Sequence, residues 1–124
     1  MVAVGIAIAS ISNVAFSDEG NLSGFYEVAR QNCHDIGCIR VEINRINNEI
    51  LKLLGERTAY VKRAGDLKSK MSRVADDRQR VVDQEQMIVD KSIELGVPIE
   101  ISVPAFRAIV ETSIKFQQGY IDNQ

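Results

Sequence analysis

The sequence predicts an all-α protein, a three-helix protomer whose first helix is the longest. Apolar residues, or residues with long apolar stems, recur at alternating steps of four and three from Ile39 to Met71, which is the spacing of one face of a long helix. Two later segments repeat apolar residues at helical spacing. The 124-residue chain contains 2 Pro and 6% aromatic residues, so helix breakers and strand-forming aromatics are scarce. This length is typical of one domain.

Residues 1–17 differ from the rest of the chain. The stretch Val2–Ser17 carries no charge and is rich in Ala, Val and Ile, but it is shorter than the ~20 apolar residues that span a bilayer. Ala15-Phe16-Ser17 fits a signal-peptidase site, so we expect a signal peptide and a periplasmic or secreted protein. No Lys or Arg precedes the apolar run. The alternatives are a start that lies upstream, or an apolar N-terminal extension on a cytoplasmic protein.

Residues 18–37 form a polar lead-in, within which Ser23–Arg30 has the composition of a short helix. Cys33 and Cys38 could close a small disulfide loop in an exported protein, or remain thiols in a reducing compartment. His34 lies between them, but three candidate ligands fall short of the four that a structural zinc site needs. We therefore expect no metal and no cofactor.

The long helix is predicted to begin near Asp35 or Cys38 and to end near Ser69 or Lys70. Its apolar stripe cannot be buried against itself, so it requires a partner. One member of the stripe, Arg57, does not suit a core. A polar, aperiodic loop follows at residues 70–76.

The second helix is predicted over Asp77–Leu95, with Asp76 or Asp77 as its N-cap and Gly96 and Pro98 at its end. Its apolar face is predicted to contain Val81, Val82, Ile88, Val89, Ile93 and Leu95.

The third helix is predicted to begin after Ser102 as N-cap, with Pro104 in its first turn and a hydrophobic staple between Ile101 and Phe106. Its inward stripe starts with apolar residues and continues through polar ones. The members are Phe106, Ile109, Val110, Ser113, Gln117 and Tyr120.

Basic residues of the long helix share a face with this polar stripe. Arg57 and Lys68 are eleven residues apart, which places them within about 20° of each other around the helix and ~16 Å apart along it. Ser113 and Gln117 face inward from the third helix, and Arg80 lies at the start of the second. Buried like charges cost several kcal/mol each without counter-ions. An anionic ligand with at least two carboxylates would supply them.

Arg40 precedes Arg57 by seventeen residues, so it lies about 100° around the helix and ~25 Å away. It could therefore serve an equivalent pocket in a partner chain if two long helices pair antiparallel. The alternative for Arg57 is a snorkelling side chain, and for Gln117 a satisfied interior amide. The joint occurrence of these polar residues favours a site.

Other function classes lack support. The net charge of −2 and the absence of basic runs interleaved with aromatics argue against nucleic-acid binding. With one histidine and no Ser–His or Cys–His pair on the helical core, no nucleophile is apparent. An enzyme of this kind must act by positioning and electrostatics.

The segment from about Cys38 to Tyr120 resembles the all-helical class of chorismate mutases and the related isochorismate-pyruvate lyases, so we assign residues 38–124 to a type II chorismate mutase domain. The spacing of the polar residues is similar to the family's active-site series. The segments that carry the resemblance are Ile39–Ile46, Leu53–Arg57, Tyr60–Lys62, Leu67–Lys68, Asp77–Val81 and Glu111–Gln117.

The resemblance implies an intertwined homodimer with two sites that convert chorismate to prephenate, a step of aromatic amino-acid biosynthesis. It also implies a role for each residue. Arg57 and the partner subunit's Arg40 would hold the substrate carboxylates, completed by Arg80 and Ser113. Lys68 and Gln117 would donate to the ether oxygen, and Asp77 would contact the ring hydroxyl. No membrane contact is expected once residues 1–17 are removed.

One position departs from the family pattern. Many mutases carry Glu immediately after the arginine of the second helix, where this chain has Val81. The lyase branch is also apolar nearby, so we favour a mutase and keep isochorismate-pyruvate lyase as the alternative. A third hypothesis is a non-catalytic helical dimer that binds a ligand.

Overall fold

The computed structural model describes residues 20–124, so the predicted signal peptide lies outside the described residues. The described chain contains helices and no strands, which confirms the all-α fold class. The predicted lead-in contains one of these helices, and the other three match the predicted three-helix protomer. The elements are α2 (Leu22–Asn32), α3 (Ile36–Lys70), α4 (Arg78–Leu95) and α5 (Ile99–Asp122).

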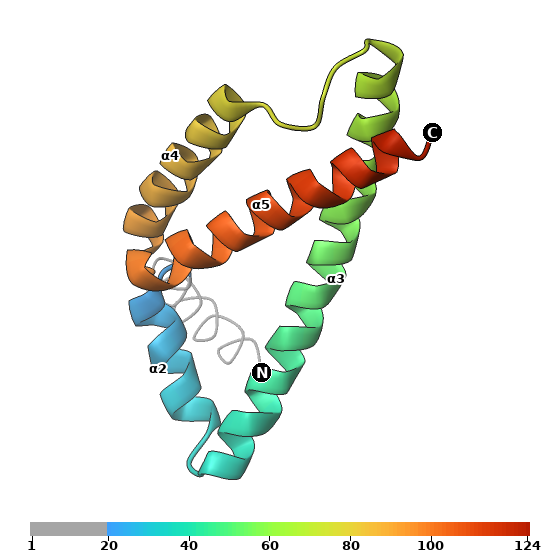
Figure 1. Ribbon diagram of the computed structural model, residues 1–124. Helices are drawn as coiled ribbons and strands as arrows, with labels where there is room; N and C mark the ends of the chain where they lie inside the picture. Colours follow the sequence, from blue (N-terminus) through green and yellow to red (C-terminus); the bar gives the residue numbers. More distant parts are fainter. Residues whose placement is uncertain (1–19) are drawn as a thin grey trace, which may run out of the picture.

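The helices form an open frame (Figure 1). α5 crosses the C-terminal half of α3 and also packs along α4. The N-terminal half of α3 extends away from α4 and α5. α2 lies between the start of α3 and the corner where α4 meets α5. At that corner, a Cβ added to Gly96 would lie 3.7 Å from the Cβ of Leu22. The cleft described below is lined by the C-terminal half of α3, where α5 crosses it.

Local capping explains where α3 begins and where α4 begins and ends. Asp35 is the N-cap of α3, and its carboxylate accepts from the Cys38 amide at 2.8 Å. α4 begins after Asp77, which caps it as predicted, and ends at Gly96, whose φ of 70° is readily adopted by glycine. The predicted bounds of both helices are confirmed.

The predicted start of α5 is wrong. The helix begins at Ile99 with Pro98 as N-cap, one turn before Ser102. Ser102 does not cap the helix, because its hydroxyl lies 2.6 Å from that of Ser92 on α4. Ile101 is therefore inside the helix rather than before it, which removes the predicted staple, and Pro104 lies in the second turn instead of the first.

The face of α4 is also narrower than predicted. Val82 and Ile93 are 61% and 69% exposed, whereas Ser92 is buried, with its hydroxyl donating to the Ile88 carbonyl at 2.6 Å. The small side chain of Ser92 lets α5 approach closely. Within residues 20–124, no helix combines the length and apolar character that crossing a membrane requires.

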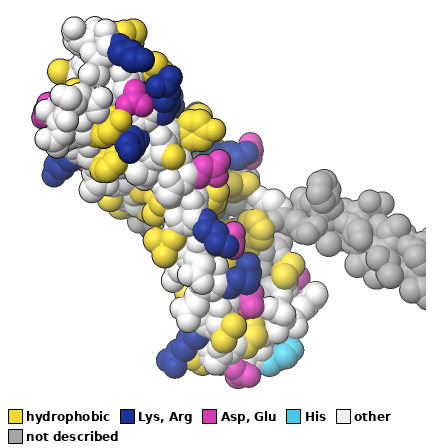
Figure 2. Space-filling view, turned by 90° about the vertical axis from the view of Figure 1, so that its right-hand side faces the viewer, with side chains coloured by type: hydrophobic (Ala, Val, Ile, Leu, Met, Phe, Trp, Pro, Cys, Tyr) yellow, Lys and Arg dark blue, Asp and Glu magenta, His cyan; other side chains and the backbone are white. Residues whose placement is uncertain are grey.

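The apolar stripe of α3 is not covered by the protomer's own helices. Ile43, Ile46, Ile50 and Leu53 are each between 45% and 64% exposed. Figure 2 views the molecule from the α3 side and shows apolar side chains gathered along its surface. In the described chain, Ala75 and Val110 are the buried apolar residues. A protomer with so small a core gains little hydrophobic stabilisation by itself.

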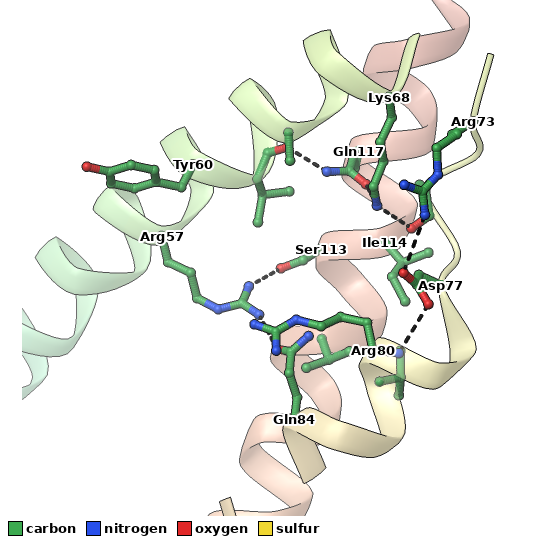
Figure 3. A pocket seen from close by; sticks show the side chains of 15 residues that line it. Arg57, Tyr60, Lys68, Arg73, Asp77, Arg80, Gln84, Ser113, Ile114 and Gln117 are labelled. Atoms are coloured by element: carbon green, nitrogen blue, oxygen red, sulfur yellow. Dashed lines mark hydrogen bonds and ion pairs between the residues drawn. The ribbon is translucent and has the colours of Figure 1, made fainter. Parts of the chain in front are cut away.

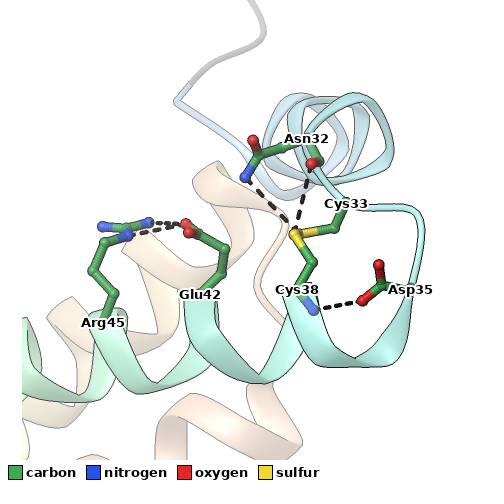
Figure 4. The surroundings of a disulfide bond; sticks show 6 residues. All are labelled: Asn32, Cys33, Asp35, Cys38, Glu42 and Arg45. Atoms are coloured by element: carbon green, nitrogen blue, oxygen red, sulfur yellow. Dashed lines mark hydrogen bonds and ion pairs between the residues drawn. A yellow bond between two sulfur atoms is a disulfide. The ribbon is translucent and has the colours of Figure 1, made fainter.

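Cys33 and Cys38 form a disulfide, with their Cα atoms 5.4 Å apart. Figure 4 shows that it joins the end of α2 to the first turn of α3, beside the capping Asp35. No group of three or more His, Cys, Asp or Glu side chains in the described part of the chain is arranged to hold a metal ion.

Candidate active site

A cleft of about 440 Å³ lies between the C-terminal half of α3, the 71–77 connection, α4 and α5 (Figure 3). Each of α3, α4 and α5 contributes both polar and apolar side chains to its lining. The lining residues are Arg57, Tyr60, Val61, Ala64, Lys68, Arg73, Ala75, Asp77, Arg80, Val81, Gln84, Val110, Ser113, Ile114 and Gln117.

The structure brings together seven of the eight residues that the sequence selected as site residues. The eighth, Arg40, is exposed near the start of α3 and does not line the cleft. It is about 25 Å along the helix axis from Arg57. The residues that meet are Arg57, Lys68, Asp77, Arg80, Val81, Ser113 and Gln117.

Arg57 is held by neutral acceptors from two other helices. One Nη donates to the Ser113 hydroxyl at 2.8 Å, and the other donates to the Gln84 amide oxygen at 3.4 Å. A guanidinium carries five N–H donors, so several remain for a ligand. Figure 3 shows Arg57 and Arg80 on the same side of the cleft as Gln84.

Lys68 and Gln117 form the opposite side of the cleft. The Lys68 ammonium donates to the Gln117 amide oxygen at 2.9 Å and to the Ala75 carbonyl at 3.0 Å. The Gln117 amide nitrogen donates to the Val61 carbonyl at 2.6 Å, and Gln117 is only 5% exposed. These contacts fix which end of the amide faces Lys68. One N–H of each group has no acceptor within residues 20–124, and both groups belong to the same cluster.

Asp77 connects the start of α4 to the cleft rim. One of its carboxylate oxygens accepts from the Arg80 amide at 3.1 Å as the N-cap, and the other lies 3.7 Å from an Nη of Arg73. This cap orders the first turn of α4 and so fixes the directions in which the side chains of Arg80 and Val81 project from it. Val81 contributes an apolar side chain to the lining.

The cleft holds more positive than negative charge. Four cationic side chains line it against the single carboxylate of Asp77. No ion pair within residues 20–124 involves Arg57, Lys68 or Arg80, and the hydrogen bonds of Arg57 and Lys68 to Ser113, Gln84, Gln117 and Ala75 use neutral acceptors. A site of this charge favours an anion with more than one carboxylate.

An ion pair and a hydrogen bond outside the cleft link the helices that surround it. Arg78 at the start of α4 bonds both carboxylate oxygens of Glu111 on α5, at 3.0 and 3.1 Å. Hydrogen bonding from Arg78 lowers the pKa of Glu111. On the other side, the Tyr120 hydroxyl donates to Asp66 and lowers the pKa of that carboxyl, linking α5 to α3.

Eight of the fifteen lining residues were not predicted as site residues, and three of these eight form a hydrogen bond or an ion pair with a charged side chain of the predicted set. Gln84 lies one turn after Arg80 on α4, and this i,i+4 spacing could have identified it. Ala75 and Arg73 lie in the connection, where no periodicity indicates which residues face inward. Ala75 contributes a backbone carbonyl, which no side-chain pattern can indicate.

Comparisons of the sequence with known proteins identify a family. The sequence profile of the family described as chorismate mutase type II matches residues 39–118. The chain is 34% identical over 83 residues to a bifunctional chorismate mutase/prephenate dehydratase of Aquifex aeolicus (strain VF5). That alignment covers 64% of this chain and 23% of the relative, so the chain spans about a quarter of the relative's length. No solved structure matches the chain.

Proposed function

The chain belongs to the chorismate mutase type II family, and from this membership we propose that it rearranges chorismate to prephenate in a homodimer. The observation that carries the proposal is the cleft in which Arg57 and Lys68 are bonded to neutral partners and in which neither they nor Arg80 are ion-paired within the described chain. Chorismate carries two carboxylates, which such a site would bind.

The reaction needs no nucleophile. It is a unimolecular rearrangement, in which the enzyme holds the substrate in its compact conformation and thereby removes an entropic cost. Arg57, Arg80 and Ser113 would hold carboxylates. As the C–O bond breaks, negative charge builds on the ether oxygen, where the remaining N–H groups of Lys68 and Gln117 would donate. These contacts strengthen in the transition state, which is what accelerates the chemical step.

The exposed apolar stripe of α3 supports the homodimer. The stripe of α3 formed by Ile43, Ile46, Ile50 and Leu53 is exposed, and each such side chain contributes about 1.5–3 kcal/mol when it becomes fully buried. Antiparallel pairing of two α3 helices would cover this stripe. It would also carry Arg40 to the partner's cleft, adding a cation for the second carboxylate.

Turnover of the two candidate substrates tests the proposal. The purified protein is mixed with chorismate and, separately, with isochorismate. Loss of chorismate absorbance with formation of prephenate is the expected result. Salicylate and pyruvate from isochorismate would establish the lyase instead, an alternative favoured by the apolar Val81 in the lining. No turnover of either would leave a non-catalytic ligand-binding dimer.

Mixed dimers test whether a site uses two chains. Arg40→Ala and Arg57→Ala homodimers should both be nearly inactive. A heterodimer of the two variants contains one intact site and one doubly altered site, because each site takes Arg57 from one chain and Arg40 from the other. With random pairing, the mixture should recover about a quarter of wild-type activity. An active Arg40→Ala homodimer would place Arg40 outside the site. No recovery from two inactive homodimers, with heterodimers present by mass spectrometry, would show that no site combines Arg57 of one chain with Arg40 of the other.

We also propose that the protein is exported. The disulfide between Cys33 and Cys38 supports this, because disulfides persist in oxidising compartments. The uncharged stretch Val2–Ser17 supports it independently. Expression of the natural chain followed by N-terminal sequencing should give a mature protein that begins near Asp18. A retained N-terminus in the cytoplasmic fraction would contradict export.

A further inference from the structure

We propose that Arg73 is a further substrate-binding residue, which pairs with Asp77 in the free enzyme and transfers to a substrate carboxylate when the cleft is filled. The inference rests on the proposed function, because it assumes a dicarboxylate ligand in this cleft. Arg73 comes from the 71–77 connection and lines the cleft opposite Arg57 (Figure 3). Its guanidinium adds a fourth cation from the same chain.

The backbone at the end of α3 determines where Arg73 lies. Ser72 adopts a φ of 56°, in the left-handed region, and its amide donates to the Ser69 carbonyl at 3.2 Å. The Arg73 amide then donates to the Lys68 carbonyl at 2.8 Å. These two bonds form a Schellman motif, in which glycine is the usual left-handed residue. The motif returns the chain towards the cleft and couples Arg73 directly to the turn that carries Lys68.

The rest of the connection is anchored, so a change at Arg73 can be confined to its side chain. Ala75 is buried, its carbonyl accepts from Lys68, and its amide donates to the Gln118 side chain at 2.9 Å. Asp77 is fixed as the N-cap of α4. Arg73 therefore projects from a backbone that is bonded on both sides of it.

The contact between Arg73 and Asp77 is suited to exchange. The closest nitrogen and oxygen are 3.7 Å apart, and the two side chains are 55% and 40% exposed. Exposed ion pairs of this kind contribute little to stability, so replacing the Asp77 carboxylate with a ligand carboxylate costs little. The exchange also frees the second oxygen of Asp77 to accept a hydrogen bond from a ligand hydroxyl. One movement would thus complete two substrate contacts.

Lys70 provides a matched control. It carries the same charge as Arg73, lies three residues earlier on the last turn of α3, is exposed, and does not line the cleft. Removing either charge lowers the positive potential around the site by a similar amount. Only a direct contact with the substrate distinguishes Arg73 from Lys70.

Steady-state kinetics with chorismate tests the inference on Arg73→Ala, Arg73→Lys and Lys70→Ala. Loss of a direct charge-assisted hydrogen bond at a partly exposed site should raise KM about tenfold in Arg73→Ala, with kcat changed by less than about twofold. Arg73→Lys should recover most of this loss. The increase should shrink as NaCl is raised from about 0.05 to 0.5 M, because salt screens the contact. Lys70→Ala should keep the wild-type KM.

The outcomes separate the two proposals. If the wild type turns over chorismate and Arg73→Ala has the same KM as Lys70→Ala, Arg73 does not bind substrate. A loss confined to kcat, or a lowered melting temperature that Arg73→Lys fails to restore, would also overturn the inference and indicate a structural role. If the wild type binds chorismate without turnover, the proposed function fails, and Kd values from calorimetry replace KM in the same comparison. Absence of binding would overturn both.

Discussion

Replacing Lys68 with Met is the most direct perturbation of the proposed chemistry. The Lys68 ammonium bonds the Gln117 amide oxygen and the Ala75 carbonyl, at 2.9 and 3.0 Å, and keeps one N–H for a ligand. Methionine preserves a similar unbranched stem and removes the charge. The substitution therefore deletes the donor to the ether oxygen while the helix and its packing are retained.

The expected loss is large because the contact strengthens in the transition state. Removing one preorganised donor to a developing oxyanion typically lowers kcat by about 10²–10³. Lys68 also contributes a full charge to a cleft that binds a dianion, so KM should rise as well. We expect kcat/KM to fall by about 10³ or more. Gln117 would also lose the partner that fixes its amide, so the effects of Lys68→Met and Gln117→Ala should not be additive.

Loss of chorismate absorbance measures the effect, with Lys70→Met as the control on the same turn of α3. The control should retain activity within about twofold, because Lys70 does not line the cleft. Sedimentation and urea unfolding establish that both variants keep the wild-type assembly and fold. A Lys68→Met enzyme that is folded and retains more than a tenth of wild-type kcat/KM would refute the assignment of Lys68.

Three further predictions concern stability and are measured by urea unfolding. Gly65→Ala should destabilise by about 1–3 kcal/mol, because its Cβ would lie 3.0 Å from the Tyr120 ring, whereas Gly55→Ala, with nothing within 4 Å, should stabilise by about 0.5–1 kcal/mol. Replacing both cysteines of the 33–38 disulfide with serine should cost about 2 kcal/mol, and no loss would show that the small loop is ordered without it. Tyr120→Phe should destabilise the protein more at pH 7 than at about pH 3. The Tyr120 bond lowers the pKa of Asp66, so its contribution is present above the ordinary value of 3.8 and disappears as the pH falls through the folded value. An equal loss at both pH values would contradict this linkage.

Much of the site could be predicted because helical periodicity fixes the direction of each side chain. The spacing of Arg57 and Lys68 on α3, and of Ser113 and Gln117 on α5, assigned the faces that the structure brings together. The helices α3 and α4 were also predictable, since Asp35 and Asp77 are strong N-caps. In these segments, local propensity and tertiary packing favour the same arrangement.

Prediction failed where tertiary contacts decide the local structure. Ser102 has the composition of an N-cap, but its hydroxyl lies against Ser92 on α4, and α5 starts a turn earlier at Pro98. Arg73 was not predicted as a site residue, because Ser72 adopts the left-handed conformation that usually requires glycine and turns the chain back towards the cleft. No periodic pattern in the sequence indicates either the contact between Ser92 and Ser102 or the left-handed turn at Ser72.

The choice of partners for the cleft cations is what separates a binding site from a structural ion-pair network. Carboxylates at the positions of Gln84 and Gln117 would pair with Arg57 and Lys68 and neutralise them before a ligand arrived. Amide oxygens instead fix the directions of the two cations and leave their net charge in place. The free energy that this retained repulsion costs the empty protein is recovered when a dianion enters. The same neutral partners therefore explain the geometry of the cleft and support the dicarboxylate ligand that we propose for it.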